Sequence, residues 1–478
     1  MKRLVIIGFF FLGITTAIPQ NLPKLEMAFS SSISEQRLLK SVRELVLCGN
    51  RLGGSYSGDK SVEYISKNLK IAGFKVEIQE EPGHLVFDSY AWTLKVISPK
   101  KLQNVIQNEW LGGYSPSVPR TRAKLKLYKK DSIDLATIKG CLLLSQQRIS
   151  PSDIAKLAEA GAVGILQMPQ RYIERIAATT FVSNLKAAND NPIPLFNLSY
   201  TSGDTLKKSL MDNKEIEIAF SSRTEIHEGT TKTVIATIEG KSTDYVIVCA
   251  HGDSDSGGPG ADDNASGAAG VMEMARVFKS LIQSKQLPVP EKSLKFIVWG
   301  TEMQSASYFI KQHISEIEKI RGVFNYDQIG YGETRNCIYF ESNELPHNKD
   351  LMLISKQVME EYAGKKGFWE EATTNPSQGG TDSYMFLPSS LKRLKAPEVE
   401  IPAIAVCTAA WGESRRVRQT PGWASSAWKG HPDSVVIDFA PYYHTTLDIP
   451  KLTTQREPFN MANAVKAVGI VLLRSAWK

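Results

Sequence analysis

One histidine and four aspartates are gathered in the stretch HGDSDSGGPGADDNASG, which begins at His251. The stretch follows the apolar run YVIVCA and precedes AAGVMEMARVF, whose apolar residues recur at helical spacing. Crowded carboxylates repel one another, and burying them costs more free energy. The stretch is therefore either a solvated loop or a site for a cation that neutralises the charge. Residues elsewhere in the chain decide between these two readings.

Further acids and histidines occupy equivalent places in the chain. Glu302 comes just after the apolar run LKFIVWG, Asp327 follows GVFNY, and His444 lies in YYHTTLD. In a parallel α/β sheet, ligands bind beyond the carboxyl ends of the strands, where His251 and Asp263 are also expected. A single acid at a strand end is most often a turn residue. Together these five residues, which include two of only seven histidines, favour one shared site.

A ligand set of carboxylates and imidazoles is suited to zinc. Softer metals prefer thiolate ligands instead. The two oxygens of Asp263 can bridge a pair of metal ions. Two neighbouring zinc ions can hold a hydroxide at neutral pH that attacks an amide carbonyl. A nearby glutamate can handle the proton. The residue set therefore predicts that bound metal ions neutralise the aspartate-rich loop.

Alternating apolar runs and helical patterns surround these residues from about residue 231 onward. The apolar runs TVIATIEG, DYVIVCA, LKFIVWG, GVFNYD and IPAIAVCT suit buried strands, and GAAGVMEMARVFKSLIQ has helical spacing. The alternation predicts an α/β fold, a mostly parallel mixed sheet with helices on both faces. We assign residues 223–478 to this domain and residues 18–94 to its N-terminal part.

Residues 95–222 have a different sequence pattern from the rest of the chain. The runs KGCLLLS and SPSDIAKLAEAGAVGILQM indicate strand, capped helix and strand, without a cluster of acids and histidines. We expect a small inserted α/β domain that covers or shapes a site elsewhere.

Bulk composition excludes several classes of protein. The chain has 478 residues, of which 42% are hydrophobic and 22% charged, as in globular proteins. Its net charge is +7, but lysine and arginine are scattered, and no nucleic-acid-binding motif is present, so we expect no nucleic acid partner. The five cysteines form no CxxC pair, and several lie in apolar runs, which predicts buried thiols.

The N-terminus reads MKRLVIIGFFFLGITTAIPQ, with two basic residues before a short apolar run. This pattern predicts a signal peptide over residues 1–17 and a secreted or periplasmic protein. A retained membrane anchor is the alternative. The run is short for a bilayer span, and no later segment has the length of one, so we expect no transmembrane span in the mature chain.

These motifs resemble the secreted co-catalytic zinc exopeptidases, a family that includes bacterial leucyl aminopeptidases and carboxypeptidase Q-like proteins. The resemblance rests on AHGDSDSGGPGADDNASG, FIVWGTEM, VFNYDQIG and YYHTTLD, and on RLGGSYSGDKSVEYISKNLKIAGFKV near the N-terminus. It covers nearly all of the mature chain. The insert resembles a protease-associated domain, notably in IKGCLLLS and KLAEAGAVGILQM.

Carried over onto this sequence, the resemblance implies a role for each candidate. Asp263 would bridge two zinc ions, His251 and Asp327 would complete one metal site, and His444 would serve the other. Glu302 would be the catalytic general base. Asp253 would orient His251 through a hydrogen bond, as carboxylates beside metal-bound imidazoles commonly do. A peptide or dipeptide is the implied substrate, with aminopeptidase activity favoured.

One position departs from the family pattern, which has two consecutive glutamates, the first catalytic and the second a metal ligand. Here Met303 occupies the second place, and a thioether is a poor partner for zinc beside carboxylates. Glu302 could turn inward as the ligand, the second metal site could be weak, or peptidase activity could be lost. Two alternatives follow: a peptidase-like binding protein with impaired catalysis, or a one-zinc acyltransferase like the glutaminyl cyclases. The sequence leaves the oligomeric state open.

Overall fold

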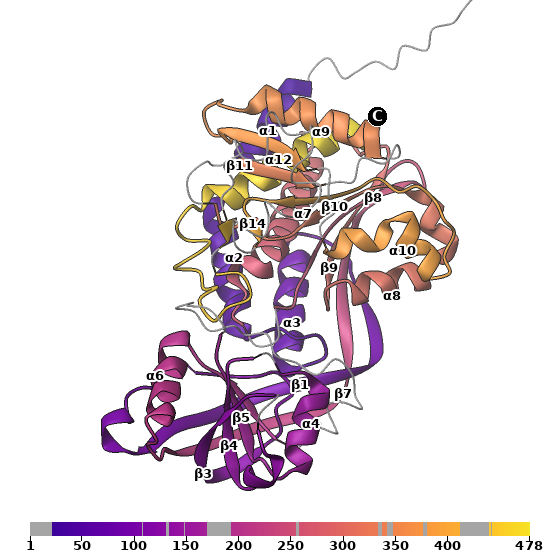
Figure 1. Cartoon of the computed structure of the whole chain (residues 1–478). Coiled ribbons are helices and arrows are strands. Elements are labelled where there is room, and N and C mark those ends of the chain that lie inside the picture. Colours follow the sequence, from indigo (N-terminus) through magenta and orange to yellow (C-terminus); the bar gives the residue numbers. More distant parts are fainter. Residues whose placement is uncertain are drawn as a thin grey trace, which may run out of the picture.

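The computed structural model shows two parts that share one long pair of strands, β1 and β7 (Figure 1). No helix among the described residues is long and apolar enough to cross a membrane. The expected signal peptide, residues 1–17, lies outside the described residues. The structure describes residues 22–107, 109–130, 133–147, 149–169, 193–254, 258–332, 337–341, 348–375, 380–411, 439–440 and 442–478.

Parallel strands form the centre of the larger part. Strand β8 (Tyr245–His251) lies between β9 (Ser293–Trp299) and β10 (Ile320–Tyr326), parallel to both. Strand β13 (Ala403–Cys407) extends the parallel run beside β10. Antiparallel neighbours flank this run, because β7 (Glu217–Ile238) pairs with β9, and β11 (Cys337–Glu341) pairs with β13. Strand β12 (Glu371–Asn375) lies at the edge, parallel to β11. A separate short pair contains β14 (Ala410–Trp411) and β15 (Phe439–Ala440).

Helices cover both faces of this sheet because side chains alternate along each buried strand. In β8, Val246, Val248 and Ala250 join one apolar cluster, whereas Tyr245, Ile247 and Cys249 join another. The first cluster includes residues of α1 (Leu22–Ser32), α2 (Glu35–Cys48), α3 (Tyr56–Ile71), α7 (Gly267–Gln283), α9 (Lys349–Tyr362) and α12 (Phe459–Ser475). The second includes residues of α8 (Gln304–Gln312), α10 (Pro388–Arg393) and the 3₁₀ helices Ile314–Lys319 and Asp382–Phe386.

The expected fold class, a mixed α/β sheet with helices on both faces, is confirmed by this arrangement. The prediction of buried thiols holds for three of the described cysteines, whereas Cys48 is only partly buried. Cys141, Cys249 and Cys407 are buried, and none of them forms a disulfide.

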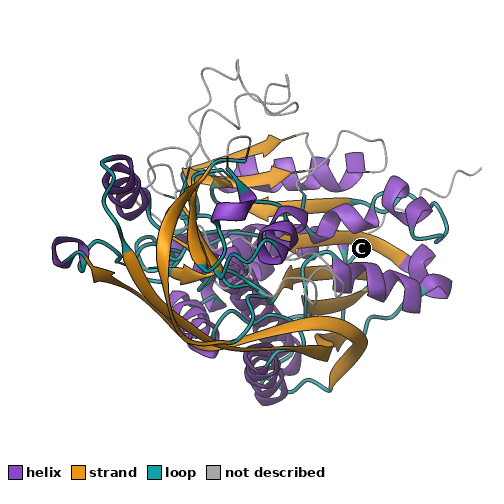
Figure 2. Ribbon diagram, turned by 60° about the horizontal axis from the view of Figure 1, so that its bottom comes forward, coloured by secondary structure: helices purple, strands orange, loops and turns teal. Residues whose placement is uncertain are grey.

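The smaller part continues the same sheet. Strand β1 (Val76–Ser98) pairs antiparallel with β7 from Val76 opposite Ala236 to Ser98 opposite Glu217 (Figure 2). Beyond β7 the strands follow in the order β3, β4, β5, β6 and β2. They span Val118–Tyr128, Cys141–Ser145, Gly164–Gln167, Leu195–Asn197 and Trp110–Leu111. Helices α4 (Pro151–Glu159) and α6 (Tyr200–Met211) and the 3₁₀ turns Lys100–Leu102 and Leu135–Thr137 complete this part.

This smaller part has its own apolar clusters, which contain Leu142, Leu144 and Phe220 in one and Leu143 and Ile165 in the other. The boundaries expected at residues 95 and 222 fall inside β1 and the neighbouring β7. The division into domains, and the protease-associated character of the insert, stay predictions.

Candidate metal centre

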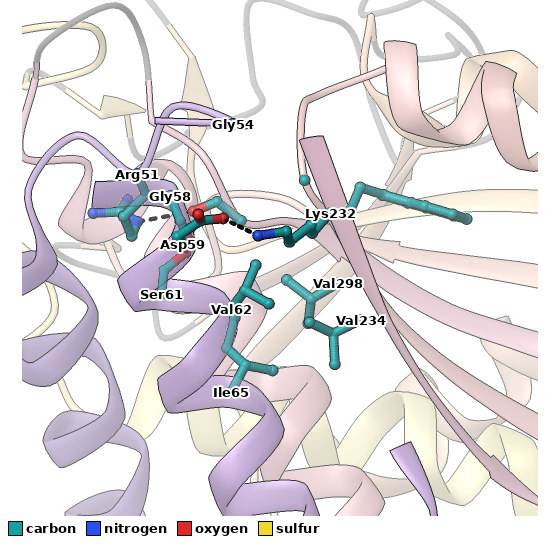
Figure 3. A pocket seen from close by; sticks show the side chains of 14 residues that line it. Arg51, Gly54, Gly58, Asp59, Ser61, Val62, Ile65, Lys232, Val234 and Val298 are labelled. Atoms are coloured by element: carbon teal, nitrogen blue, oxygen red, sulfur yellow. Dashed lines mark hydrogen bonds and ion pairs between the residues drawn. The ribbon is translucent and has the colours of Figure 1, made fainter. Parts of the chain in front are cut away.

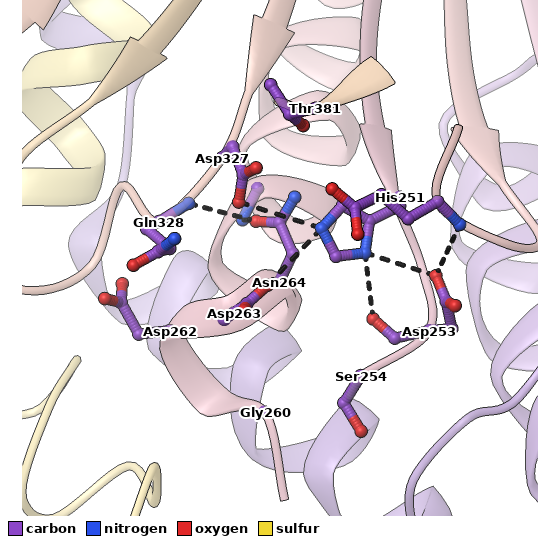
Figure 4. A network of polar contacts seen from close by, with 12 residues as sticks. His251, Asp253, Ser254, Gly260, Asp262, Asp263, Asn264, Asp327, Gln328 and Thr381 are labelled. Atoms are coloured by element: carbon purple, nitrogen blue, oxygen red, sulfur yellow. Dashed lines mark hydrogen bonds and ion pairs between the residues drawn. The ribbon is translucent and has the colours of Figure 1, made fainter. Parts of the chain in front are cut away.

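Three predicted ligands meet at the carboxyl edge of the parallel strands. His251 ends β8, Asp327 directly follows β10, and Asp263 lies in the π-turn Ala261–Ser266 that leads into α7. One ligand atom from each lies within 4.8 Å of the other two. His251 Nε2 is 3.3 Å from Asp263 Oδ1 and 3.7 Å from Asp327 Oδ1 (Figure 4).

The donor atoms of this group fit a cation. His251 Nε2 and Asp327 Oδ1 are buried and make no hydrogen bond. Buried polar atoms are rarely left without a partner, and a cation placed among them would provide one. One imidazole and two carboxylates are also a common donor set for zinc with an open position. The three residues therefore fit zinc both by chemistry and by their unpaired atoms.

A second histidine approaches Asp263 from the other side. His444 Nε2 lies 3.1 Å from Asp263 Oδ2, and about a third of the His444 side chain is exposed (33%). Asp263 thus stands between two imidazoles, as a bridging carboxylate would. Within the described residues, no third histidine, cysteine, aspartate or glutamate completes a group of three with this pair. Among the described residues, one candidate site therefore has three donor residues, His251, Asp263 and Asp327, and the other has two, Asp263 and His444.

Asp253 connects His251 to the turn that carries Glu302. His251 Nδ1 lies 3.2 Å from Asp253 Oδ1, which fixes the ring so that Nε2 faces Asp263 and Asp327 (Figure 4). The same oxygen accepts a hydrogen bond of 3.0 Å from the Glu302 backbone N–H. One carboxylate therefore sets both the orientation of an imidazole donor and the backbone position of the predicted base.

Met303 follows Glu302 in the turn between β9 and α8. Its backbone has φ +56°, a region that side chains other than glycine rarely adopt. Its N–H donates to Asp382 Oδ1 over 2.7 Å. The Met303 side chain packs against the apolar cluster that contains Phe309 and Phe386. Met303 therefore contributes to the core on this face of the sheet.

Crowding of the carboxylates changes their proton affinities. Burial raises the pKa of Glu302 well above its ordinary value; the nearby imidazole of His251 opposes the shift, and Asp327 adds to it. Burial would lower the pKa of His251, but the negative charges of Glu302 and the neighbouring aspartates outweigh it and raise that pKa. Burial also raises the pKa of Asp382 to about 7. Protons would therefore neutralise the centre without a metal, and a divalent cation could take their place.

Comparison with known proteins identifies the family. The model of peptidase family M28 matches residues 233–468, a range that includes the centre described above.

Residues 233–468 of the chain belong to peptidase family M28.

The resemblance to co-catalytic zinc exopeptidases is confirmed by this match and by the relatives of the M28 chain. An aminopeptidase of Pseudomonas aeruginosa is 26% identical over 322 residues, which cover 61% of this chain and 56% of the relative. Leucine aminopeptidase 2 of Trichophyton rubrum is 25% identical over 301 residues, with 61% and 57% covered. The M28 chain thus spans a little over half the length of these curated relatives.

Solved structures share the fold of the M28 chain. A zinc aminopeptidase from Bacillus subtilis superposes with a TM-score of 0.61 at 19% identity and covers 93% of this chain and 96% of its own. A peptidase M28 precursor from Shewanella amazonensis gives a TM-score of 0.61 at 19% identity, with 96% of each chain covered. Both likenesses extend over nearly the whole chain.

Sequence reasoning missed Arg51, which lies under the aspartate-rich loop of the M28 chain. Its side chain is buried (1% exposed) and donates only to backbone carbonyls. Arg51 Nε donates to Gly252 O over 2.8 Å, and the two terminal nitrogens reach Pro259 O and Gly260 O over 2.9 and 2.8 Å. The guanidinium therefore holds both ends of the loop between His251 and Asp263, and its charge lies close to Asp253 and Asp448.

Asp448 is a second missed residue, although it closes the YYHTTLD stretch. Its two oxygens accept the backbone N–H groups of Asp262 and Asp263 over 2.8 and 3.0 Å. Asp448 stands four residues after His444, so one short segment supplies an imidazole and fixes the backbone of the carboxylate it faces. The signal available in the sequence was an acid at a fixed short distance from a candidate ligand.

A small cavity beside Arg51 is lined by α3, β7 and β9 (Figure 3). Its volume is about 10 Å³, and Lys232 Nζ donates to Asp59 Oδ1 over 2.8 Å at its wall. A cavity of this size holds one water molecule at most. It is therefore too small to be the peptide-binding site.

The crowded carboxylates predict how stability depends on pH without metal. Burial raises the folded pKa of Asp382 from 3.8 to about 7, and that of Asp448 likewise to about 7. Well below pH 3.8 both carboxyl groups are protonated in the folded and in the unfolded chain, so they do not change the free energy of unfolding. Above it the unfolded chain loses protons that the folded chain keeps, so stability falls as pH rises through the folded pKa.

We therefore expect the free energy of unfolding of zinc-free protein to fall by about 2 kcal/mol between about pH 5 and about pH 7, counting one such group. Urea titrations of chelator-treated protein at several pH values measure it. Zinc-loaded protein is the control, and its stability should fall less over this range because the cation replaces the protons. Stability of the zinc-free protein that rises with pH would contradict the assignment.

Proposed function

We propose that this chain is a zinc-dependent exopeptidase, an aminopeptidase or dipeptidase-like enzyme, that hydrolyses peptide bonds. The observation that carries the proposal is the convergence of His251, Asp263 and Asp327 in an M28 fold, with Glu302 on the adjoining turn. The names of the relatives, aminopeptidase and leucine aminopeptidase, support release of residues from the amino end.

The residues of the chain divide the work as follows. His251, Asp263 and Asp327 would hold one zinc ion, and Asp263 with His444 would hold a second more weakly. Zinc, when bound, supplies a hydroxide nucleophile at neutral pH. Glu302 takes the proton from the attacking water and delivers it to the leaving amine, a role that suits a carboxylate whose pKa is raised by burial. Asp253 keeps His251 Nε2 aimed at the centre.

Hydrolysis of aminoacyl anilides tests this proposal. Zinc-free protein should be inactive on leucine p-nitroanilide and should gain activity as zinc is added. The N-acetylated form of the same anilide should resist hydrolysis, since an aminopeptidase requires a free amino group. Dipeptides with blocked amino or carboxyl ends separate aminopeptidase from carboxypeptidase and dipeptidase activity. Zinc-loaded protein that cleaves none of these substrates would overturn the proposal.

Met303 favours one second candidate, a peptide-binding protein with impaired catalysis. Its side chain packs into an apolar cluster, and the pair Asp263 and His444 has no third His, Cys, Asp or Glu donor among the described residues. A binding protein of this kind would bind dipeptides only when zinc is present and would release them without hydrolysis. Isothermal titration with a dipeptide, followed by analysis of the recovered peptide, distinguishes the two candidates.

The insert is proposed to limit the length of peptide that reaches the centre. Tyr114 belongs to the smaller part of the chain. Burial raises the pKa of Tyr114 to about 12, and the charge of the nearby Asp253 adds to this rise. Its hydroxyl donates to Leu85 O on β1 over 3.0 Å. The smaller part therefore lies beside the loop that follows His251.

Removal of the insert should change selectivity for peptide length. Ser89 of β1 pairs with Thr224 of β7, so a two-residue Asn-Gly turn can join these positions in place of residues 90–223. We expect dipeptide hydrolysis to persist and the ratio of kcat/KM for decapeptides over dipeptides to rise about tenfold, since a steric barrier worth about 1.4 kcal/mol is removed. A ratio unchanged from the full chain would contradict this role, and a thermal melt checks folding.

We also propose that the protein is exported. Support comes from the N-terminal sequence alone, in which basic residues precede an apolar run and small residues. Sequencing of the mature N-terminus in the natural host would place cleavage near residue 17 if this is right.

A further inference from the structure

Asp382 is a buried carboxylate next to the turn that carries Glu302, and no role has yet been given to it. It begins the 3₁₀ helix Asp382–Phe386, and its exposed fraction is 0%. Asp382 Oδ1 accepts the N–H of Met303 over 2.7 Å. Asp382 Oδ2 is buried and makes no hydrogen bond. Because an isolated buried charge is costly, a fold keeps such a group where it has a use.

The turn that Asp382 contacts is fixed through its backbone at successive residues. Thr301 N donates to Ser305 Oγ over 3.1 Å, Glu302 N donates to Asp253 Oδ1 over 3.0 Å, and Met303 N donates to Asp382 Oδ1. Two carboxylates therefore hold the amides of Glu302 and Met303, one from the loop after β8 and one from the 3₁₀ helix. The strained φ of Met303 persists because these contacts fix it.

A chain of buried polar groups holds Asp382 itself in place. Cys249 Sγ donates to Asn325 Oδ1 over 3.4 Å, and Asn325 Nδ2 donates to Thr381 Oγ1 over 2.9 Å. Cys249 and Asn325 each precede a predicted zinc ligand by two residues, in β8 and β10. Figure 4 shows Thr381 beside His251 and Asp327. The segment that carries Asp382 is thus attached to the two strands that carry His251 and Asp327.

We propose that Asp382 is a positioning residue for catalysis: its hydrogen bond to the Met303 amide holds Glu302 in place relative to His251 and Asp327. This inference rests on the proposed function, because it gives Glu302 a chemical role. Asp382 acts on Glu302 through the backbone of Met303. A shift of about 1 Å in a catalytic group can lower the rate about a hundredfold, so an anchor of this kind has a large effect.

Two substitutions separate the hydrogen bond from the charge. Asp382→Asn keeps an oxygen that accepts the Met303 N–H, and we expect its kcat to stay within about fivefold of the natural protein. Asp382→Ala removes the acceptor, and we expect kcat to fall about a hundredfold, while KM and bound zinc stay within about twofold. Ser307→Ala is the matched control. It removes a 2.8 Å bond to the carbonyl of the same residue, Met303, from within α8, and kcat should not change.

Three results would overturn the inference. An Asp382→Ala variant with natural kcat would show that the bond is dispensable. An Asp382→Asn variant as slow as Asp382→Ala would show that the charge matters and the bond does not. A Ser307→Ala variant as slow as Asp382→Ala would show that any weakening of the turn has this effect. Asp382→Ser, whose shorter side chain cannot reach the amide, replaces the alanine variant if that one does not fold.

A measurement on zinc-free protein keeps this test distinct from the proposed function. Hydrogen exchange of the Met303 amide should be at least about tenfold faster in Asp382→Ala than in Asp382→Asn, since only the latter retains the bond. Crystal structures of the two variants should show Glu302 displaced in the first alone. If the natural protein cleaves no peptide, the proposed function fails; if Glu302 stays in place in Asp382→Ala, the positioning role fails.

Discussion

Replacing Glu302 with glutamine is expected to lower kcat at least about a hundredfold, the usual scale for losing a general base, and to leave bound zinc unchanged. Glutamine has nearly the same shape as glutamate but cannot accept the proton of the attacking water. Glu302 is also absent from the group of His251, Asp263 and Asp327 whose ligand atoms lie within 4.8 Å of one another. Steady-state kinetics and metal analysis of the same preparation provide both readings.

Glu318→Gln is a suitable control for this experiment, because Glu318 is exposed and lies in the 3₁₀ helix Ile314–Lys319 away from the centre. Its kcat and zinc content should match those of the natural protein. Loss of zinc together with activity in Glu302→Gln would show that Glu302 is a ligand that has taken the place of the missing glutamate. The role of base would then belong to another residue.

Replacing Met303 with glutamate is expected to tighten the second zinc site about a hundredfold and to raise turnover at limiting zinc. Among the described residues, no third His, Cys, Asp or Glu joins Asp263 and His444, whereas zinc sites normally have at least three protein ligands. The charged side chain is expected to leave the apolar cluster around Phe309 and to turn toward the centre. Zinc-free protein should lose about 1–3 kcal/mol of stability, because a polar group then replaces a packed thioether.

Met303→Gln is the matched control, since it has the shape of glutamate without the charge and should not tighten the site. Competition with a chelator of known zinc affinity measures both variants. Equal zinc affinity in Met303→Glu and the natural protein would show that residue 303 cannot reach the second metal. The weak second site would then follow from the backbone of the turn, which Asp382 fixes.

Much of the centre could be predicted from the sequence because its members stand at strand ends. His251, Glu302 and Asp327 each come at or just after an apolar run, and parallel strands bring such positions to one edge. The pairing of His251 with Trp299 at the ends of β8 and β9 shows how this register works. Residue type and position along the chain were sufficient here.

Residues that act through the backbone could not be predicted in this way. Arg51 binds carbonyl groups and Asp382 binds an amide, so no ligand-like spacing marks them. Asp448 also binds amides, and only its position four residues after His444 marks it. Their partners are distant in sequence, and only the fold brings them together.

The full length of strand β1, which pairs with β7 up to Ser98, was also missed, for a different reason. Pro82 and Gly83 are residues typical of turns, yet β1 runs through them to Ser98. A register shift between Pro82 and His84 absorbs the extra residue, as β-bulges do.

A zinc titration of metal-free protein, with hydrolysis of leucine p-nitroanilide measured at each step, tests the central claim most directly. The account predicts one tight zinc ion, lost in His251→Asn, and a second that binds only in excess and raises the rate of hydrolysis. Protein that binds zinc at His251, Asp263 and Asp327 but hydrolyses no peptide at any zinc concentration would contradict the account.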